Sequence, residues 1–110
     1  MTSALQMVQL QLDAYNARDI DAFAACFSDD VRLHELNDSS LIAEGRPALR
    51  EIYADLFEAC PELHAVLLNR IECGDVVIDH ERVSGMAPEE QEAVAIYQVR
   101  DGLIQQVWFS

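Results

Sequence analysis

The sequence predicts a single α+β domain in which helices come first and a mainly antiparallel sheet follows. Up to about residue 60, apolar residues recur at three- and four-residue steps, which is the spacing of amphipathic helices. From residue 65 onward the chain consists of apolar, β-branched runs of strand length separated by short turns. Helices that precede the strands, rather than alternating with them, indicate α+β architecture and not a doubly wound sheet. The chain has 110 residues and room for one core, so residues 1–110 are expected to form one domain.

Two helices are expected before residue 28. Ser3 and Asp19 are suitable N-caps, because their side-chain oxygens can accept hydrogen bonds from the first free backbone N–H groups of a helix. The apolar stripe of the first helix is Leu5, Val8, Leu12 and Tyr15. The apolar stripe of the second, shorter helix is Ile20, Phe23, Ala24 and Phe27. Residues 28–30 are then expected to form a turn.

A short strand and a third helix follow this turn. Val31–Glu35 alternates apolar and polar residues and predicts a strand, and Leu41–Ala43 predicts a brief extended segment. Gly45 and Pro47 mark the start of the helix, since proline is tolerated in a first helical turn, and Pro61 ends it. The residues expected to be buried on this helix are Leu49, Ile52, Tyr53, Leu56 and Phe57.

The rest of the chain predicts two β-hairpins. Gly74-Asp75 and Asp101-Gly102 are two-residue turn sequences, and Asp-Gly is a strong hairpin signal because both residues tolerate positive φ. The strands that these turns join are expected at Ala65–Cys73, Val76–Ser84, Ala93–Arg100 and Leu103–Phe109. Both faces of the last hairpin are apolar, whereas a sheet covered on one side usually has a polar outer face. We therefore expect something to cover the convex side.

Composition excludes several classes of partner. The chain carries 20 acidic and 7 basic residues, a formal net charge of −13, and such a surface repels phosphate backbones and anionic lipid. Neither nucleic acid nor a membrane is therefore an expected partner. The three cysteines are odd in number and lack CxxC spacing, so we expect reduced thiols and no zinc site. The N-terminus resembles neither a signal peptide nor a membrane helix, which favours a cytoplasmic protein.

Glu35 is the first candidate for chemistry. Side chains of a strand alternate between its two faces, so Val31, Leu33 and Glu35 share one face. The face with two aliphatic residues should point to the core, where desolvation would suit a carboxylate to general acid or base work. The alternative is that Glu35 lies in water at the end of its strand or pairs with an arginine.

The run from Val76 to Arg82 is the most polar stretch in the predicted sheet. Alternation places His80 and Arg82 on one face, and Asp79 and Glu81 on the other. The acids and the histidine therefore cannot form one metal site. One hypothesis is that a polar face of this strand enters a pocket, and the alternative is a cross-strand ladder of ion pairs on an exposed face. The sequence has no HExxH, GxGxxG, P-loop or GxSxG motif, so no metal and no cofactor are predicted.

Several local strings identify a family resemblance that spans nearly the whole chain. They are NARD at 16–19, FSDDV at 27–31, ALREIY at 48–53 after Gly45, and VRDGLI at 99–104. With the order of elements, these strings make the chain similar to the nuclear transport factor 2-like superfamily, in its SnoaL-like and ketosteroid isomerase-like branch. The resemblance implies three helices packed on the concave face of a strongly curved sheet, which form a cone with an internal pocket. It also implies a homodimer through the convex face.

The resemblance also implies roles for individual residues. A carboxylate on the strand after the second helix moves the proton in ketosteroid isomerase, and the matching residue here is Glu35. The positions of the two oxyanion-hole donors fall on Gln11 and near Ala95, so these donors are not retained. The same alignment turns His80, Arg82 and Tyr97 into the pocket. His80 would shuttle a proton, Arg82 would hold an anionic oxygen and Tyr97 would donate a hydroxyl, or Tyr97 would simply be a core residue.

These observations lead to one principal hypothesis about function. The chain is expected to be a cofactor-free enzyme of the ketosteroid isomerase and SnoaL-like type that acts on a small, largely apolar carbonyl compound. Glu35 would be its base, and His80, Arg82 and Tyr97 would orient the substrate. The alternatives are a non-catalytic module that binds an apolar ligand, and an interaction or dimerisation domain whose cone is filled.

Overall fold

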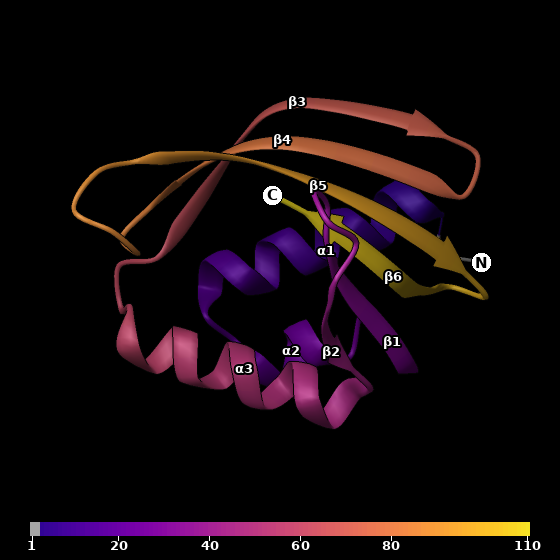
Figure 1. The fold of residues 1–110 in the computed structure, drawn as a ribbon, viewed down its shortest axis with the longest axis horizontal. Coiled ribbons are helices and arrows are strands. Elements are labelled where there is room, and N and C mark those ends of the chain that lie inside the picture. The colour runs from indigo at the N-terminus through magenta and orange to yellow at the C-terminus, as the bar shows by residue number, and fades with distance from the viewer. Residues whose placement is uncertain (1–2) are drawn as a thin grey trace.

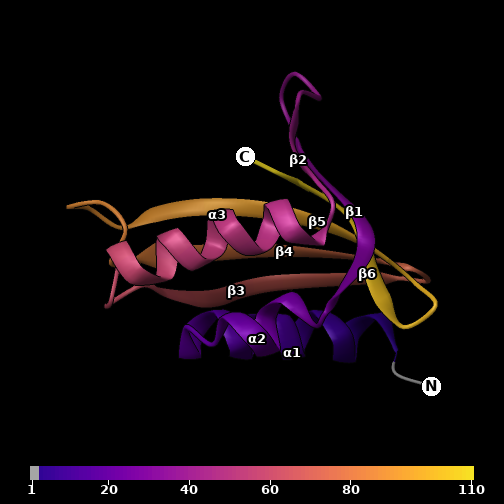
Figure 2. The ribbon, with the colours of Figure 1, turned by 90° about the horizontal axis from the view of Figure 1, so that it is seen from below.

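The structure is a computed structural model that describes residues 3–110 of the chain. It contains three helices and a curved sheet of six strands within these residues, as Figure 1 and Figure 2 show. The elements are α1 (Ala4–Ala17), α2 (Ile20–Ala24), β1 (Phe27–Glu35), β2 (Leu41–Glu44), α3 (Arg46–Ala59), β3 (His64–Cys73), β4 (Val76–Ser84), β5 (Gln91–Arg100) and β6 (Leu103–Phe109). This arrangement confirms the predicted α+β fold, with helices on one side of a mixed and mainly antiparallel sheet.

The sheet has the strand order β2-β1-β6-β5-β4-β3. Every neighbouring pair is antiparallel except β1 and β6, which are parallel. Figure 1 shows β3, β4 and β5 arching over α1 and α3, so the helices lie on the concave face. Both predicted two-residue turns are present, and Asp101 and Gly102 have φ of 55° and 76°, as a tight hairpin requires.

The helix ends follow the predicted signals. The Ser3 hydroxyl accepts a hydrogen bond from the Gln6 backbone N–H and the Gln6 side chain accepts one from the Ser3 N–H, which forms a capping box. The Asp19 carboxylate likewise caps α2 by accepting from the backbone N–H of Ala22. No helix in residues 3–110 combines the length and the apolar character that crossing a bilayer requires.

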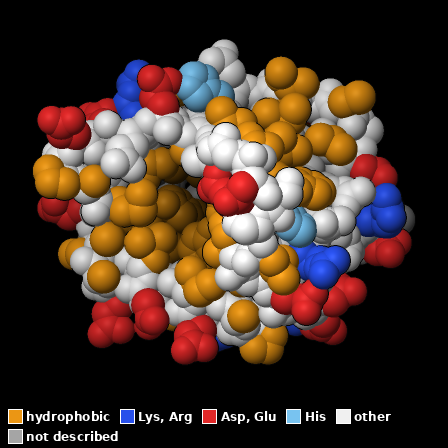
Figure 3. Space-filling view, viewed as in Figure 1, with side chains coloured by type: hydrophobic (Ala, Val, Ile, Leu, Met, Phe, Trp, Pro, Cys, Tyr) orange, Lys and Arg blue, Asp and Glu red, His pale blue; other side chains and the backbone are white. Residues whose placement is uncertain are grey.

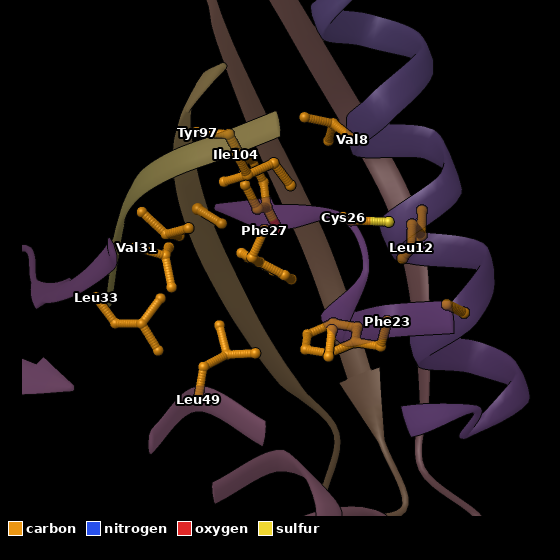
Figure 4. Close-up of a cluster of buried hydrophobic side chains, with 14 of the residues drawn as sticks. Val8, Leu12, Phe23, Cys26, Phe27, Val31, Leu33, Leu49, Tyr97 and Ile104 are labelled. Carbon is orange, nitrogen blue, oxygen red and sulfur yellow. The ribbon is translucent and has the colours of Figure 1, made fainter. Parts of the chain in front are cut away.

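The core lies between the helices and the concave face of the sheet, and Figure 4 shows part of it around Phe27. Two predictions about this region are wrong. Phe27 does not end a helix but begins β1, so residues 28–30 extend the strand instead of forming a turn. Ile52 is 41% exposed, because the inward stripe of α3 runs through Leu49, Tyr53 and Phe57, at steps of four residues, and Ile52 lies outside it.

Candidate active site

A cavity of about 260 Å³ lies between the concave face of the sheet and the helices. Figure 3 shows a hollow on this face of the molecule that is lined mainly by hydrophobic side chains. The aromatic residues that line the cavity are Tyr15, Phe23, Phe27, Tyr53, Tyr97 and Phe109. The polar side chains Gln11, Glu81 and Ser110 also line it, and among the described residues Glu81 has the one charged side chain in the lining. This volume lies near the lower end of the range of about 300–1,000 Å³ that is typical of ligand pockets, so the cavity suits a small molecule.

Glu81 on β4 is a buried carboxylate with no partner in the described part of the chain. Its side chain faces the cavity and the residue is only 8% exposed. No hydrogen bond or ion pair joins its carboxylate to another residue within 3–110. Burial, and secondly the negative charge of Asp79, raise the pKa of Glu81 to about 7, while Arg70 opposes this shift. A carboxyl with this pKa can accept and donate protons at neutral pH.

Asp79 lies two residues before Glu81 on the same face of β4, but its environment is different. The residue is fully buried, and its two carboxylate oxygens accept hydrogen bonds from Arg70 Nε at 2.6 Å and Arg70 Nη2 at 2.9 Å. Arg70 on β3 also donates from Nη1 to Oε1 of Gln9 on α1, at 2.7 Å. The hydrogen bonds to Asp79 raise the pKa of Arg70, so the guanidinium stays charged. This ion pair is a structural link between sheet and helix, and Asp79 does not line the cavity.

Three tyrosines supply hydroxyl groups around the same cavity. Burial first, and the charge of Glu81 second, raise the pKa of Tyr15 to about 12. Burial is also the main reason why the pKa values of Tyr53 and Tyr97 lie well above the ordinary range. Tyr15 and Tyr53 pack edge to face, with ring centroids 6.4 Å apart, and come from α1 and α3. These hydroxyls therefore remain protonated at neutral pH and can donate hydrogen bonds to a ligand oxygen.

Glu35 does not line the cavity. The alternation predicted for β1 is correct, since Val31 and Leu33 are buried, but Glu35 is the last residue of the strand and is only half-buried. Figure 2 shows the β1–β2 hairpin projecting away from the rest of the fold. Glu35 accepts hydrogen bonds from the backbone N–H and the side-chain amide of Asn37, at 3.1 and 2.9 Å. These contacts belong to the local turn after β1. The prediction that Glu35 points into the pocket is therefore wrong.

His80 and Arg82 lie on the outer face of the sheet, so the expectation that they point inward is also wrong. His80 Nε2 lies 2.6 Å from Oε1 of Glu92, and Arg82 Nε lies 3.5 Å from Oε2 of Glu90. As alternation predicted, His80 and Arg82 share one face of β4, and Asp79 and Glu81 share the other. The face that points inward, however, is that of Asp79 and Glu81. Each face of the strand carries two aliphatic residues, so alternation alone could not decide between them.

One signal in the sequence favoured the acidic face. The two-residue turn at Gly74-Asp75 sets the register of β3 and β4, and this register places Arg70 directly opposite Asp79. A buried acid needs such a basic partner, whereas His80 and Arg82 pair with Glu92 and Glu90 at the exposed surface, where a charge needs no partner. The register therefore pointed to Asp79 as an inward residue, and Glu81, two residues on, must share its face.

The other predicted positions are inside the cavity. Tyr97 is buried and lines it, as the family resemblance implied, and its role as a hydroxyl donor stays a prediction. Gln11 and Ala95, the positions matched to the oxyanion donors, line the cavity as well. Tyr15, one helical turn after Gln11, brings a hydroxyl to the same wall. Within residues 3–110, no three side chains of His, Cys, Asp or Glu gather in an arrangement that could hold a metal ion.

Three helices packed on the concave face of a curved sheet, with a mostly apolar cavity between them, define an α+β domain of the cone type. A sequence model described as the SnoaL-like domain matches residues 8–107. The chain therefore belongs to the SnoaL-like domain family. No curated protein sequence is significantly similar to it.

Solved structures support the same fold. An uncharacterised cystatin-fold protein from Novosphingobium aromaticivorans is 25% identical, with a TM-score of 0.89 over 100% of this chain and 99% of that one. A candidate polyketide cyclase from Sinorhizobium meliloti is 21% identical, with a TM-score of 0.81 over 94% of this chain and 93% of the other. A candidate ketosteroid isomerase from Kribbella flavida is also 21% identical, with a TM-score of 0.79 over 94% of this chain and 73% of that protein. At this identity, the last two likenesses concern the fold alone.

Proposed function

We propose that the protein is a cofactor-free enzyme of the SnoaL-like and ketosteroid isomerase-like type, in which Glu81 transfers a proton on a small, largely apolar carbonyl compound. The observation that carries this proposal is the unpaired carboxylate of Glu81 in an apolar cavity. Its pKa of about 7 suits both proton uptake and proton release near neutral pH. Glu81 thus takes the role that the sequence assigned to Glu35.

The proposed reaction begins with ionised Glu81. The carboxylate removes a proton from the carbon next to the substrate carbonyl, and the electron pair of the broken C–H bond forms an enolate. The hydroxyls of Tyr15, Tyr53 and Tyr97 are the candidate donors to the enolate oxygen, because all three line the cavity and stay protonated. Protonated Glu81 then returns the proton to the same or another carbon, so that atoms and charges balance. Such donors act on charge that develops in the transition state.

The test is turnover of a panel of small enolisable ketones by Glu81→Gln and Glu35→Gln. We expect Glu81→Gln to lose about 10²–10⁴-fold in kcat/KM, which is the usual contribution of a general base. Wild-type kcat/KM should rise with pH through about 7, as Glu81 ionises. Glu58→Gln, an exposed change on α3, serves as the matched control. If the loss occurs in Glu35→Gln instead, Glu81 is not the base.

A second candidate function is non-catalytic binding of an apolar ligand. It is favoured by the lining of the cavity, which is mostly aromatic and aliphatic. In that case small ketones bind equally to the wild type and to Glu81→Gln, and neither protein turns them over. An interaction domain whose cone is filled would bind none of them.

We also propose that two copies of the chain associate through the convex face of the sheet. Five side chains lie side by side across β3, β4, β5, β6 and β1 on this face, in a single register row. They are Ile71, Ile78, Ile96, Trp108 and His34. Ile71 is 61% exposed, and the His34 ring stacks on Trp108 at 5.0 Å. An apolar row of this kind is suited to burial in an interface.

The oligomeric state can be measured by light scattering at micromolar concentration. The wild type should have the mass of a dimer, and Ile96→Lys in the centre of the row should be a monomer. Ile52→Lys, at an exposed isoleucine of α3, is the matched control and should leave the dimer intact. A monomeric wild type would contradict the proposal.

A further inference from the structure

Among the described residues, the side chains that line the cavity include a negative charge but no positive charge. Glu81 is the one charged side chain among its lining residues, and none of the seven arginines lines it. Six arginines contact carboxylates or backbone carbonyls elsewhere in the described residues: Arg18, Arg32, Arg46, Arg50, Arg70 and Arg82. A carboxylate or phosphate ligand would enter an apolar cavity beside a carboxylate without any counter-charge, which is strongly unfavourable.

Glu81 itself lacks the partner that a buried carboxylate needs. Arg70 is the guanidinium whose charge lowers the pKa of Glu81, but its Nε and Nη2 donate to Asp79 at 2.6 and 2.9 Å and its Nη1 donates to Gln9. The cost of a buried charge falls when an opposite charge contacts it. Within residues 3–110 nothing supplies that charge, so the ligand is the remaining source.

The walls of the cavity also suit a positive group. Tyr15, Tyr53 and Tyr97 belong to α1, α3 and β5, so aromatic rings approach the cavity from three elements. Phe23 adds a fourth ring, 4.6 Å from that of Tyr53. Aromatic faces attract organic cations, and the attraction is stronger in a desolvated site than at an exposed one. An apolar body would fill the rest of the volume.

We infer that this cavity is a binding site for a small organic cation, an ammonium group on an apolar body, which pairs with the carboxylate of Glu81. The inference goes beyond the proposed function because it requires no turnover, although both involve Glu81. The same site should reject a carboxylate of equal shape. A neutral molecule of that shape should bind more weakly than the cation.

Binding of a cation should be linked to the ionisation of Glu81. The charged or titratable groups that face Glu81 are Asp79 on β4, Arg70 on β3, Tyr15 on α1, Tyr53 on α3 and Tyr97 on β5. The tyrosines stay neutral, and Arg70 and Asp79 form their own pair. The titration near pH 7 is therefore that of Glu81, and the ionised form is the one that binds. With a pKa of about 7, affinity should rise about tenfold between pH 6 and pH 8.

The experiment compares benzylammonium, benzyl alcohol and benzoate by isothermal titration calorimetry on the full chain. At pH 8 we expect benzylammonium to bind at least tenfold more tightly than benzyl alcohol, and benzoate not to bind. The advantage of benzylammonium should largely disappear at pH 6. Heats measured in two buffers of different ionisation enthalpy should show a proton released on binding near pH 7.

Two variants distinguish binding of the cation at Glu81 from binding at the acidic surface of the protein. Glu81→Gln should bind benzylammonium and benzyl alcohol with similar affinity, and unchanged benzyl alcohol binding shows that the cavity is intact. Glu58→Gln, at an exposed surface position, should behave as the wild type. Raising the salt from 0.15 to 0.5 M should weaken a surface pair more than a buried one. If Glu81→Gln does not fold, the same comparison can be made with the wild type at pH 5, where Glu81 is protonated and therefore neutral.

Three results would overturn the inference: binding of none of the probes at millimolar concentration, no preference for benzylammonium in the wild type, or the same preference in Glu81→Gln. None of these measurements uses turnover. A protein that binds the amine but converts no ketone retains this inference and loses the proposed reaction. A protein with the opposite behaviour loses only this inference.

Discussion

Two neighbouring acids on the inward face of β4 lie in opposite environments. Asp79 is fully buried and accepts two hydrogen bonds from the guanidinium of Arg70, which also contacts Gln9 of α1. Glu81, two residues further along, faces the cavity with no partner among residues 3–110. Two residues on one strand therefore differ not in chemistry or in face but in what the neighbouring elements bring to them. The paired acid stabilises the fold, and the unpaired acid is available for a ligand or a proton.

The paired and the unpaired acid are also expected to affect the free energy of folding differently. For an acid that is paired and hydrogen-bonded in the native state, the attraction offsets the cost of burying both charges, and removing one partner is costly because the other charge stays buried. An acid that is buried without a partner opposes folding whenever it is ionised. Groups of the second kind are often found in functional sites, where the protein tolerates their cost. Four substitutions test this comparison.

The largest effect on stability is expected at Asp79, the acid that is paired with Arg70. Asp79→Ala leaves Arg70 with a mostly buried, uncompensated charge, and should lower the free energy of unfolding by about 3–5 kcal/mol. Urea denaturation at pH 7 measures this value. The matched control is Glu44→Ala, which removes the exposed pair with Arg32 at 2.9 Å and should cost at most about 1 kcal/mol. Equal losses in the two variants would mean that burial of the Asp79 pair does not matter.

Glu81→Gln should have the opposite sign and depend on pH. The pKa of Glu81 is raised from 4.5 to about 7, so the folded protein binds more protons than the unfolded chain between these values. Its contribution to stability is therefore present below about pH 4.5 and is lost as the pH rises through 7. The whole difference corresponds to about 3 kcal/mol. Glu81→Gln should accordingly stabilise the protein by up to about 3 kcal/mol at pH 8, and hardly at pH 5.

Denaturation curves at pH 5, 6 and 8 measure this dependence on the wild type and on Glu81→Gln in parallel. Glu58→Gln provides the comparison for an exposed glutamate on α3, and its effect should not change with pH in this way. A stabilisation that is the same at all three pH values would show that Glu81 is not the group that titrates.

A smaller effect is expected for a tyrosine of the cavity. No hydrogen bond within residues 3–110 involves the Tyr97 hydroxyl, so Tyr97→Phe removes no internal contact of that group and should change stability by less than about 1 kcal/mol. Turnover, by contrast, should fall if the hydroxyl stabilises an enolate. Thermal unfolding and kcat measured on one preparation separate these effects. A loss of several kcal/mol would place Tyr97 with Asp79 among the structural groups.

The smallest effect is expected on the outer face of the same strand. Arg82 is about half exposed and lies 3.5 Å from Glu90, so Arg82→Gln should change stability by no more than about 0.5 kcal/mol. It should also leave ligand binding unchanged, because the side chain points away from the cavity. Calorimetry with the probes described above checks this. Altered affinity would show that Arg82 reaches the site after all.

Much of the fold could be predicted from local patterns. The N-caps Ser3 and Asp19, the hairpins at 74–75 and 101–102, and the alternation of residues 31–35 and 76–83 all act over a few residues, and each is present as predicted. The errors concern relations between elements. Ile52 fits a helical stripe, but the direction in which α3 faces the sheet leaves it exposed. Glu35 fits the inward face of β1, but it is the last residue of the strand, and its carboxylate accepts hydrogen bonds from Asn37 in the following turn.

The candidate site shows the same division. The order of residues in β4 is enough to place Asp79 and Glu81 on one face and His80 and Arg82 on the other, because side-chain alternation is a local property of the backbone. The sequence also determined the two-residue turn that places Arg70 opposite Asp79. Which face closes onto the helices, and which acid finds a partner there, was decided only by the tertiary structure. Burial depends on contacts between elements far apart in the chain, and the Arg70 side chain can neutralise one carboxylate but not both.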